Sequence, residues 1–240
     1  MEFDEALQLA QDLGYAEADP TSDIEGLDAG RKVAILASAA FNSRVVFENV
    51  YTEGIARITA RDILYAKEMG CEIKLLGVAR LTPEGIEARV HPMLIDSDHP
   101  LASVQDSYNA VFVRGDAVQD TMFYGRGAGE MPTASAVVGD VFDCVRNILA
   151  DCCGRIGCTC YKDLPVRKIS DIRSKYFVRM EVEDRSGVLA SVAAVFGNND
   201  VSIAQVMQKR KRSELAEIVV ITETVQECIL WMRSNSRGMS

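Results

Sequence analysis

Residues 14–32 read GYAEADPTSDIEGLDAGRK, and the rest of the chain is interpreted outward from this stretch. Five carboxylates lie between Glu17 and Asp28, and a lysine follows at position 32. Crowded carboxylates repel one another, so we expect a cation among them: a ligand ammonium group, a metal ion or the lysine. Asp28 and Lys32 are four residues apart, which places them on one helix face in the order that the helix dipole favours. Spacing alone favours the simpler interpretation, an exposed ion pair worth about 0.3 to 0.5 kcal/mol.

Helices are predicted on both sides of this acidic stretch. Residues 4–13 carry apolar side chains at helical spacing, and Gly14 follows where a helix cap often lies. Residues 28–40 form a second, apolar helix that we expect to be buried, with Asp28 as its N-terminal cap or first-turn acid. Residues 15–27 are predicted to be an irregular loop between the two helices.

Strands and a long helix are predicted after the acidic stretch. Near-alternating apolar residues indicate strands over 71–80, 87–92, 110–115 and 121–125. A helix over 132–150 begins with Pro132 at a permitted first-turn position. Its apolar stripe is formed by Val137, Val138, Val141, Phe142, Val145, Ile148 and Leu149.

A domain boundary is predicted where this periodicity ends. Residues 151–175 mix Cys, Gly, Pro and charged residues and are interpreted as a linker. Strands over 176–182, 201–207 and 216–222 and helices over 187–196 and 225–233 follow, which is the opening of a ferredoxin-like unit that stops before its last strand. The sequence therefore predicts an α/β (α+β) protein with a mixed sheet and helices in residues 1–150, a linker, and a small ferredoxin-like domain in residues 176–240.

Composition excludes several classes of function. The 240 residues include 26 basic and 35 acidic side chains, a net charge of −9, which argues against nucleic-acid binding through phosphates. The longest apolar stretch is too short for a membrane helix, and the N-terminus has no signal-peptide pattern, so we expect a cytoplasmic protein. Seven cysteines are an odd number, four of them at 152, 153, 158 and 160, and neither their spacing nor a nearby histidine favours a metal site over reduced thiols.

The stretch 14–32 closely resembles the substrate loop of homoserine dehydrogenases, in which a similar acidic run leads to a lysine at the same interval. The resemblance continues through Gly54, Ile55, Ile58 and Asp62 and through the segment around His99 and Pro100. It also covers the run from Gly125 to Asp140, so residues 1–150 resemble most of that family's catalytic domain.

The resemblance implies roles for the acidic stretch. The family interconverts homoserine and aspartate semialdehyde by hydride exchange with NADP or NAD. Glu17 and Asp28 are then expected to hold the substrate through its amino and hydroxyl ends, and Lys32 to donate and accept the proton. Asp19 and Asp23 are expected to orient Lys32 or the loop.

A glycine-rich turn follows the strand over 121–125, and it lacks the spacing of a dinucleotide-binding fingerprint. From the residues alone, a tight turn before a helix is the favoured interpretation. The family resemblance implies instead that Gly127 and Gly129 close over the nicotinamide side of the cofactor, and that Gly14 also approaches it.

The segment Asp184 to Leu189 resembles the ligand loop of ACT domains, which are small amino-acid-sensing modules. This resemblance implies effector binding at Asp184, Gly187 and Val188, with threonine as the usual effector, and pairing of modules in a homo-oligomer. A dimerisation module that binds no effector is the alternative.

In that family, a nucleotide-binding domain normally precedes the segment that corresponds to the start of this sequence. We therefore expect the main cofactor site to lie on that domain. If this chain is complete, a separate chain would supply the domain. The first hypothesis is a homoserine dehydrogenase portion, with activity of this chain alone in doubt. The second is a non-catalytic amino-acid-binding regulatory or assembly subunit, and the third is a protein that binds an amino acid at the acidic loop without redox chemistry.

Overall fold

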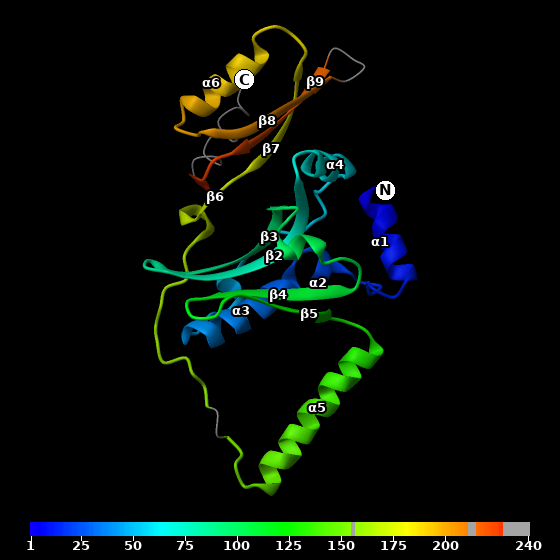
Figure 1. Cartoon of the computed structure of the whole chain (residues 1–240), viewed down its shortest axis with the longest axis vertical. Coiled ribbons are helices and arrows are strands. Elements are labelled where there is room, and N and C mark those ends of the chain that lie inside the picture. The colour runs from blue at the N-terminus through cyan, green and yellow to red at the C-terminus, as the bar shows by residue number, and fades with distance from the viewer. Residues whose placement is uncertain (155–156, 211–214, 228–240) are drawn as a thin grey trace.

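The computed structural model describes residues 1–154, 157–210 and 215–227, which form two units of mixed helix and sheet (Figure 1). This arrangement confirms the predicted α/β (α+β) class. The first unit contains α1 (Phe3–Asp12), α2 (Thr21–Ile24), α3 (Leu27–Phe41), η1 (Phe47–Asn49), β1 (Tyr51–Thr52), α4 (Ala60–Glu68), β2 (Cys71–Thr82), β3 (Gly85–Asp96), η2 (Pro100–Ser103), β4 (Tyr108–Gly115), β5 (Gln119–Arg126) and α5 (Glu130–Leu149). Then follow η3 (Ile169–Asp171), β6 (Arg173–Ser174), β7 (Phe177–Glu183), α6 (Val188–Gly197), β8 (Ile203–Arg210), β9 (Leu215–Thr222) and β10 (Val225–Gln226).

The core of the first unit lies between α3 and a sheet of order β1-β3-β2. Strands β2 and β3 form an antiparallel hairpin, and β1 pairs with β3 in parallel. One face of α3 is buried through Val33 and Ala37, whereas Ile35 and Leu36 on the other face are exposed, so the predicted burial of this helix holds for one face only. Gly77 allows the close packing, because a Cβ there would lie 2.4 Å from Val33 Cγ2.

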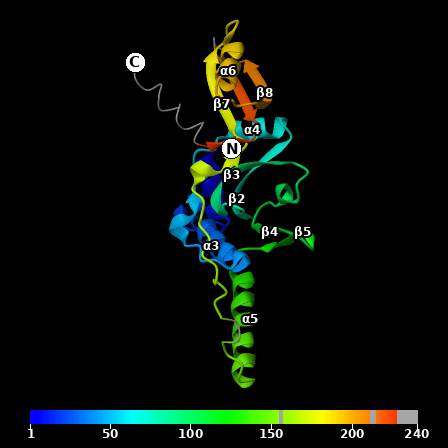
Figure 2. The same cartoon turned by 90° about the vertical axis from the view of Figure 1, so that its left-hand side faces the viewer.

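Helix α5 has no buried residue within the described chain and extends away from both units (Figures 1 and 2). Its bounds agree with the predicted helix. Its apolar stripe is 45% to 83% exposed at Val137, Val138, Val141, Phe142, Val145, Ile148 and Leu149. Strands β4 and β5, which precede it, pair only with each other among the described strands. An apolar stripe of this length ordinarily faces a core, and nothing in the described chain covers this one.

Part of the predicted linker is packed against the first unit. Lys162 N–H donates to Asn42 O at 2.8 Å. The Ile86 amide donates to Pro165 O, and the Arg167 amide donates to Ile86 O. Leu164 and Val166 contribute to the first core. Residues 162–167 therefore pack against the residues after α3 and the start of β3, which the irregular sequence of this segment did not indicate.

The second unit has the sheet order β7-β9-β8 with antiparallel neighbours, so β7 and β8 flank β9 and α6 crosses between them. This is the predicted opening of a ferredoxin-like fold. Strand alternation divides the sheet: Ile218 and Val220 pack in the core cluster with Phe196 of α6, and Glu217 and Val219 are buried on the opposite face.

The prediction of a helix over 225–233 is wrong at its start. Val225 and Gln226 form β10, which pairs antiparallel with β6. Val225 is buried in the second core, and its backbone bonds to a strand that is distant in sequence, so tertiary pairing overrides the local helical pattern. Glu227 is helical, as predicted, and the remainder of that segment, from residue 228 onward, lies outside the described residues.

Candidate functional site

The acidic stretch is a folded turn between α1 and α3. After α1, Gly14 adopts a φ of +75°, and the Tyr15 and Ala16 amides donate to Ala10 O. Gln11 Nε2 donates to Glu17 O at 3.0 Å, which ties the loop back to α1. The predicted irregular loop contains a short helix, α2, and Gly26 in the left-handed region starts α3.

Asp19 organises this turn. Its Oδ1 accepts hydrogen bonds from the Thr21 hydroxyl at 2.6 Å and from the Thr21 amide at 3.2 Å. These two hydrogen bonds lower the pKa of Asp19 below its ordinary value. The contact fixes the start of α2.

The structure brings Asp28 and Lys32 together on the exposed side of α3. Lys32 Nζ lies 2.5 Å from Asp28 Oδ2, and the two side chains are 65% and 43% exposed. Asp28 lies in the first helical turn and is not the N-terminal cap, because Gly26 takes that position. A negative charge there is stabilised by the amide end of the helix. The pair therefore presents an oriented ammonium group to a ligand that approaches from solvent.

Glu17 and Asp23 are exposed on the same loop. Among the described residues, Asp28 provides the ion pair to Lys32, and neither Glu17 nor Asp23 does. The structure thus divides the predicted acids: one orders the loop, one holds the lysine, and two point to solvent without a contact to that lysine.

The segment before α4 clamps the acidic stretch from the side. Ile55 N–H donates to Ile24 O at 2.9 Å. A Cβ on Gly54 would lie 2.4 Å from Ile24 O, so only glycine permits this approach. Gly30 packs α3 against Phe47 and Thr52 in a similar way, at Cβ distances of 2.7 and 2.9 Å. These glycines determine where the Asp28–Lys32 pair lies relative to the sheet.

The glycine-rich turn joins β5 to α5, as the sequence predicts. Gly129 is the residue before the helix, with φ +117°, and a Cβ there would lie 3.6 Å from Pro132. Gly127 has no room for a Cβ, because the Asn109 side chain fills that space. At Gly14 nothing lies within 4 Å of the Cβ position. Gly14 therefore leaves space beside its backbone for a bound group, Gly129 already has Pro132 at van der Waals distance, and internal packing accounts for Gly127.

The second unit places its candidate effector residues at the turn from β7 to α6. Gly187 precedes α6 with φ +88°, and nothing lies within 4 Å of its Cβ position. Val188 packs against the second core, and Asp184 is exposed at the end of β7. The turn thus offers an open backbone next to a fixed apolar residue.

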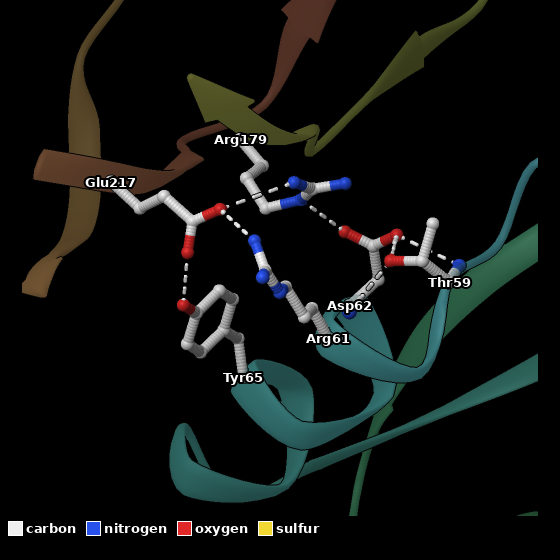
Figure 3. Close-up of polar contacts among 6 residues, drawn as sticks. All are labelled: Thr59, Arg61, Asp62, Tyr65, Arg179 and Glu217. Atoms are coloured by element: carbon white, nitrogen blue, oxygen red, sulfur yellow. Dashed lines mark hydrogen bonds and ion pairs between the residues drawn. The ribbon is translucent and has the colours of Figure 1, made fainter. Parts of the chain in front are cut away.

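Sequence reasoning missed a polar cluster between the two units, which comprises Arg61, Asp62, Tyr65, Arg179 and Glu217 (Figure 3). Glu217 on β9 is 2% exposed. It accepts a hydrogen bond from the Tyr65 hydroxyl and lies 3.1 Å from Arg61 Nη1. One signal was present: the Thr59-x-x-Asp62 spacing is a capping box that marks the start of α4.

A cavity of about 730 Å³ lies beside this cluster, between β3 and the second unit. None of its lining residues belongs to 14–32, so this hollow belongs to the interface and not to the acidic loop. His91 lines it, with Nε2 accepting from Arg89 Nε at 3.1 Å and Nδ1 lying 2.9 Å from Pro92 O. Burial lowers the pKa of His91, and the neighbouring Arg89 charge lowers it further.

Two further observations concern predicted classes of site. Within the described ranges, no three His, Cys, Asp or Glu side chains are grouped to hold a metal ion, and Cys152, Cys153, Cys158 and Cys160 are free thiols. The helices described for this chain include none with the length and apolar character needed to cross a membrane.

Comparison with known proteins gives the same family for most of the chain. The homoserine dehydrogenase family model matches residues 1–142, and the ACT domain model matches residues 176–227. The homoserine dehydrogenases of Pseudomonas aeruginosa and Bacillus subtilis are 44% and 42% identical to the chain over 232 and 227 residues. Each alignment covers 94% of this chain, but 54% and 52% of the respective relative.

Solved structures agree. A homoserine dehydrogenase from Thiobacillus denitrificans superposes with a TM-score of 0.87 at 43% identity and covers 96% of this chain and 53% of that one. The S. aureus homoserine dehydrogenase at pH 7.0 gives 0.73 at 32% identity, over 99% of this chain and 57% of that one. The chain thus spans about half the length of the relatives it matches.

Proposed function

Since this chain belongs to the homoserine dehydrogenase family, we propose that it provides the substrate-binding and proton-transfer part of a homoserine dehydrogenase. The proposed reaction interconverts L-homoserine and L-aspartate 4-semialdehyde with NADP or NAD, in the biosynthesis of threonine, methionine and isoleucine. The observation that carries the proposal is the Asp28–Lys32 pair, an ammonium held 2.5 Å from a carboxylate beside an acidic loop.

Proton transfer follows from this pair. Reduction of the aldehyde builds negative charge on its oxygen, and an ammonium next to that oxygen stabilises the charge and donates the proton. In the oxidation direction the hydroxyl proton of homoserine passes to the Lys32 amine. Asp28 holds the Lys32 side chain and contacts the hydroxyl end of the substrate, while Glu17 attracts the substrate ammonium. Asp19 fixes the loop, and Asp23 adds to its negative charge.

The nicotinamide cofactor supplies or takes the hydride when it is bound. Gly14 fits a bound group because its Cβ position is open, Gly129 fits with Pro132 at van der Waals distance on one side, and Gly127 fits less well because Asn109 occupies that space. We assign Gly14 and Gly129 to the edge of the cofactor site, with Gly127 shaping the turn.

The second unit supports a regulatory role within the same proposal. Its turn at Asp184, Gly187 and Val188 is open at Gly187, and the unit has its own core, which suits an amino-acid effector such as threonine. Pairing of two such units would make the protein a homo-oligomer. The same observations favour the second candidate function, a regulatory or assembly subunit without catalysis.

Calorimetric titration with L-homoserine separates the two functions. Binding by the parent chain that is lost in Lys32→Ala and in Glu17→Ala supports the acidic loop as the substrate site. Lys168→Ala is the matched control, because Lys168 is exposed and far along the chain from the loop. Threonine binding without any homoserine binding supports the regulatory subunit and contradicts the dehydrogenase.

A further inference from the structure

One carboxylate joins the second unit to the start of α4. Asp62 Oδ2 accepts hydrogen bonds from the Thr59 amide at 2.9 Å and from the Thr59 hydroxyl at 2.6 Å, which fixes the first turn of the helix. Asp62 Oδ1 accepts from Arg179 Nε on β7 at 2.7 Å (Figure 3). The Asp62 side chain is 11% exposed and that of Arg179 is 25% exposed, so water screens this contact poorly.

Glu217 fixes the other side of the Arg179 guanidinium. In the sheet register Arg179 pairs with Val219, so Glu217 is its diagonal neighbour on the same face. Glu217 Oε1 lies 3.4 Å from Arg179 Nη1 and 3.1 Å from Arg61 Nη1. Two arginines thus balance two carboxylates, and this cluster holds β7 and β9 against α4.

The segment before α4 is hydrogen-bonded to the acidic loop. Residues 53–58 precede the Thr59 cap, and within them the Ile58 amide donates to Ile55 O at 2.9 Å. Ile55 N–H in turn donates to Ile24 O, the last residue of α2. The chain then passes through Gly26 into α3, and Asp28 lies in the first turn. Each step is a backbone contact or a cap, so a displacement at Asp62 is passed on with little slack.

We propose that Arg179 is a positioning residue for the substrate loop, acting through Asp62, the Thr59 cap and the Ile55–Ile24 hydrogen bond. The ACT unit thereby sets the affinity of the loop for the amino-acid substrate. This inference rests on the proposed function, because it names how the substrate site is held. Hydrogen bonds from Thr59 and Arg179 outweigh the effect of burial and lower the pKa of Asp62, in keeping with a carboxylate that stays charged in this contact.

The structure offers a matched control for the test. Lys209 on β8 also bridges to α4, with Nζ 2.6 Å from Glu68 Oε2, but it does so at the C-terminal end of the helix and touches no cap. Arg179→Met and Lys209→Met each remove one cation of the second unit from an α4 carboxylate. Only the first removes a contact to Asp62, the carboxylate that bonds the Thr59 cap. Arg179→Lys restores the charge and tests for rescue.

Two readouts are needed: the dissociation constant for L-homoserine by calorimetry and the hydrogen-exchange rate of the Ile55 amide. We expect Arg179→Met to weaken homoserine binding roughly two- to thirtyfold and to speed hydrogen exchange at the Ile55 amide. Arg179→Lys should recover part of the affinity and part of the protection from exchange. Lys209→Met should change neither the affinity nor the exchange rate. Equal effects of the two Met variants overturn the proposal, as does parent-like behaviour of Arg179→Met.

The experiment also distinguishes a variant that fails to fold from a parent chain that binds no homoserine. If Arg179→Met does not fold, Asp62→Asn takes its place, because the amide keeps an acceptor for Thr59 but loses the charge that binds Arg179. If the parent chain binds no homoserine, the proposed function fails, and exchange at Ile55 alone decides the positioning role: faster exchange only in Arg179→Met supports it, and equal rates in both Met variants reject it.

Discussion

Replacing Gly54 with alanine tests how tightly the substrate loop is held. The new Cβ would lie 2.4 Å from Ile24 O and 2.7 Å from Glu25 Cα, and both of these are backbone atoms that cannot rotate away. Overpacking of this kind costs about 1 to 3 kcal/mol, and we expect the upper end because the backbone itself has to shift. For a chain of this size about 3 kcal/mol lowers the thermal midpoint by roughly 6 to 12 °C.

The assay is thermal unfolding measured by scanning calorimetry, and Gly139→Ala is the matched control. Gly139 lies inside α5 and nothing is within 4 Å of its Cβ position, so alanine there should stabilise the helix by about 0.4 to 1 kcal/mol. Gly54→Ala should also weaken homoserine binding. If Gly54→Ala unfolds at the parent midpoint, the close approach of residues 53–55 to the loop is refuted.

Three other predictions concern the interface and the surface. Tyr65→Phe removes the hydroxyl that bonds the buried Glu217 and should cost about 1.5 to 3 kcal/mol in urea unfolding; no loss would contradict the role of the cluster. Burial and the nearby Arg89 charge lower the pKa of His91 in the folded protein. Its contribution to the free energy of unfolding is therefore complete above the pKa of the unfolded state, about 6.5. That contribution is lost as the pH falls through the lower pKa of the folded state. Unfolding at pH 7 and pH 5 should therefore differ less in His91→Gln than in the parent, and an equal difference would count against this account. Phe142→Glu, in the exposed α5 stripe, should reduce self-association in sedimentation velocity, and an unchanged sedimentation coefficient would contradict a contact through α5.

Elements with a clear period could be predicted from the sequence. The helices around the acidic stretch, the strands β2 to β5 and the strands and helix of the second unit follow from local apolar spacing. The Asp28–Lys32 contact also follows from sequence, because a helix brings residues four apart together whatever surrounds them.

Features that depend on distant partners could not be predicted in this way. Val225 joins a strand because β6 is beside it, and residues 165–167 pack because Ile86 of β3 offers them backbone partners. Arg179 and Glu217 look like ordinary strand residues in sequence, and only the approach of α4 shows why two charged side chains occupy a buried sheet face. The exposure of the α5 stripe is likewise a tertiary property that helical periodicity does not reveal.

The central claim is that Lys32 transfers the proton in homoserine oxidation, and its most direct test is the rate of that reaction with NADP and with NAD. The chain is assayed alone and with a nucleotide-binding domain from a relative added in trans. We expect activity in the supplemented sample, a loss of about 10² to 10⁴ in rate for Lys32→Ala, and a parent rate for Lys168→Ala. Activity in Lys32→Ala equal to that of the parent would contradict the assignment, and no activity in any sample while threonine still binds would identify a regulatory subunit instead.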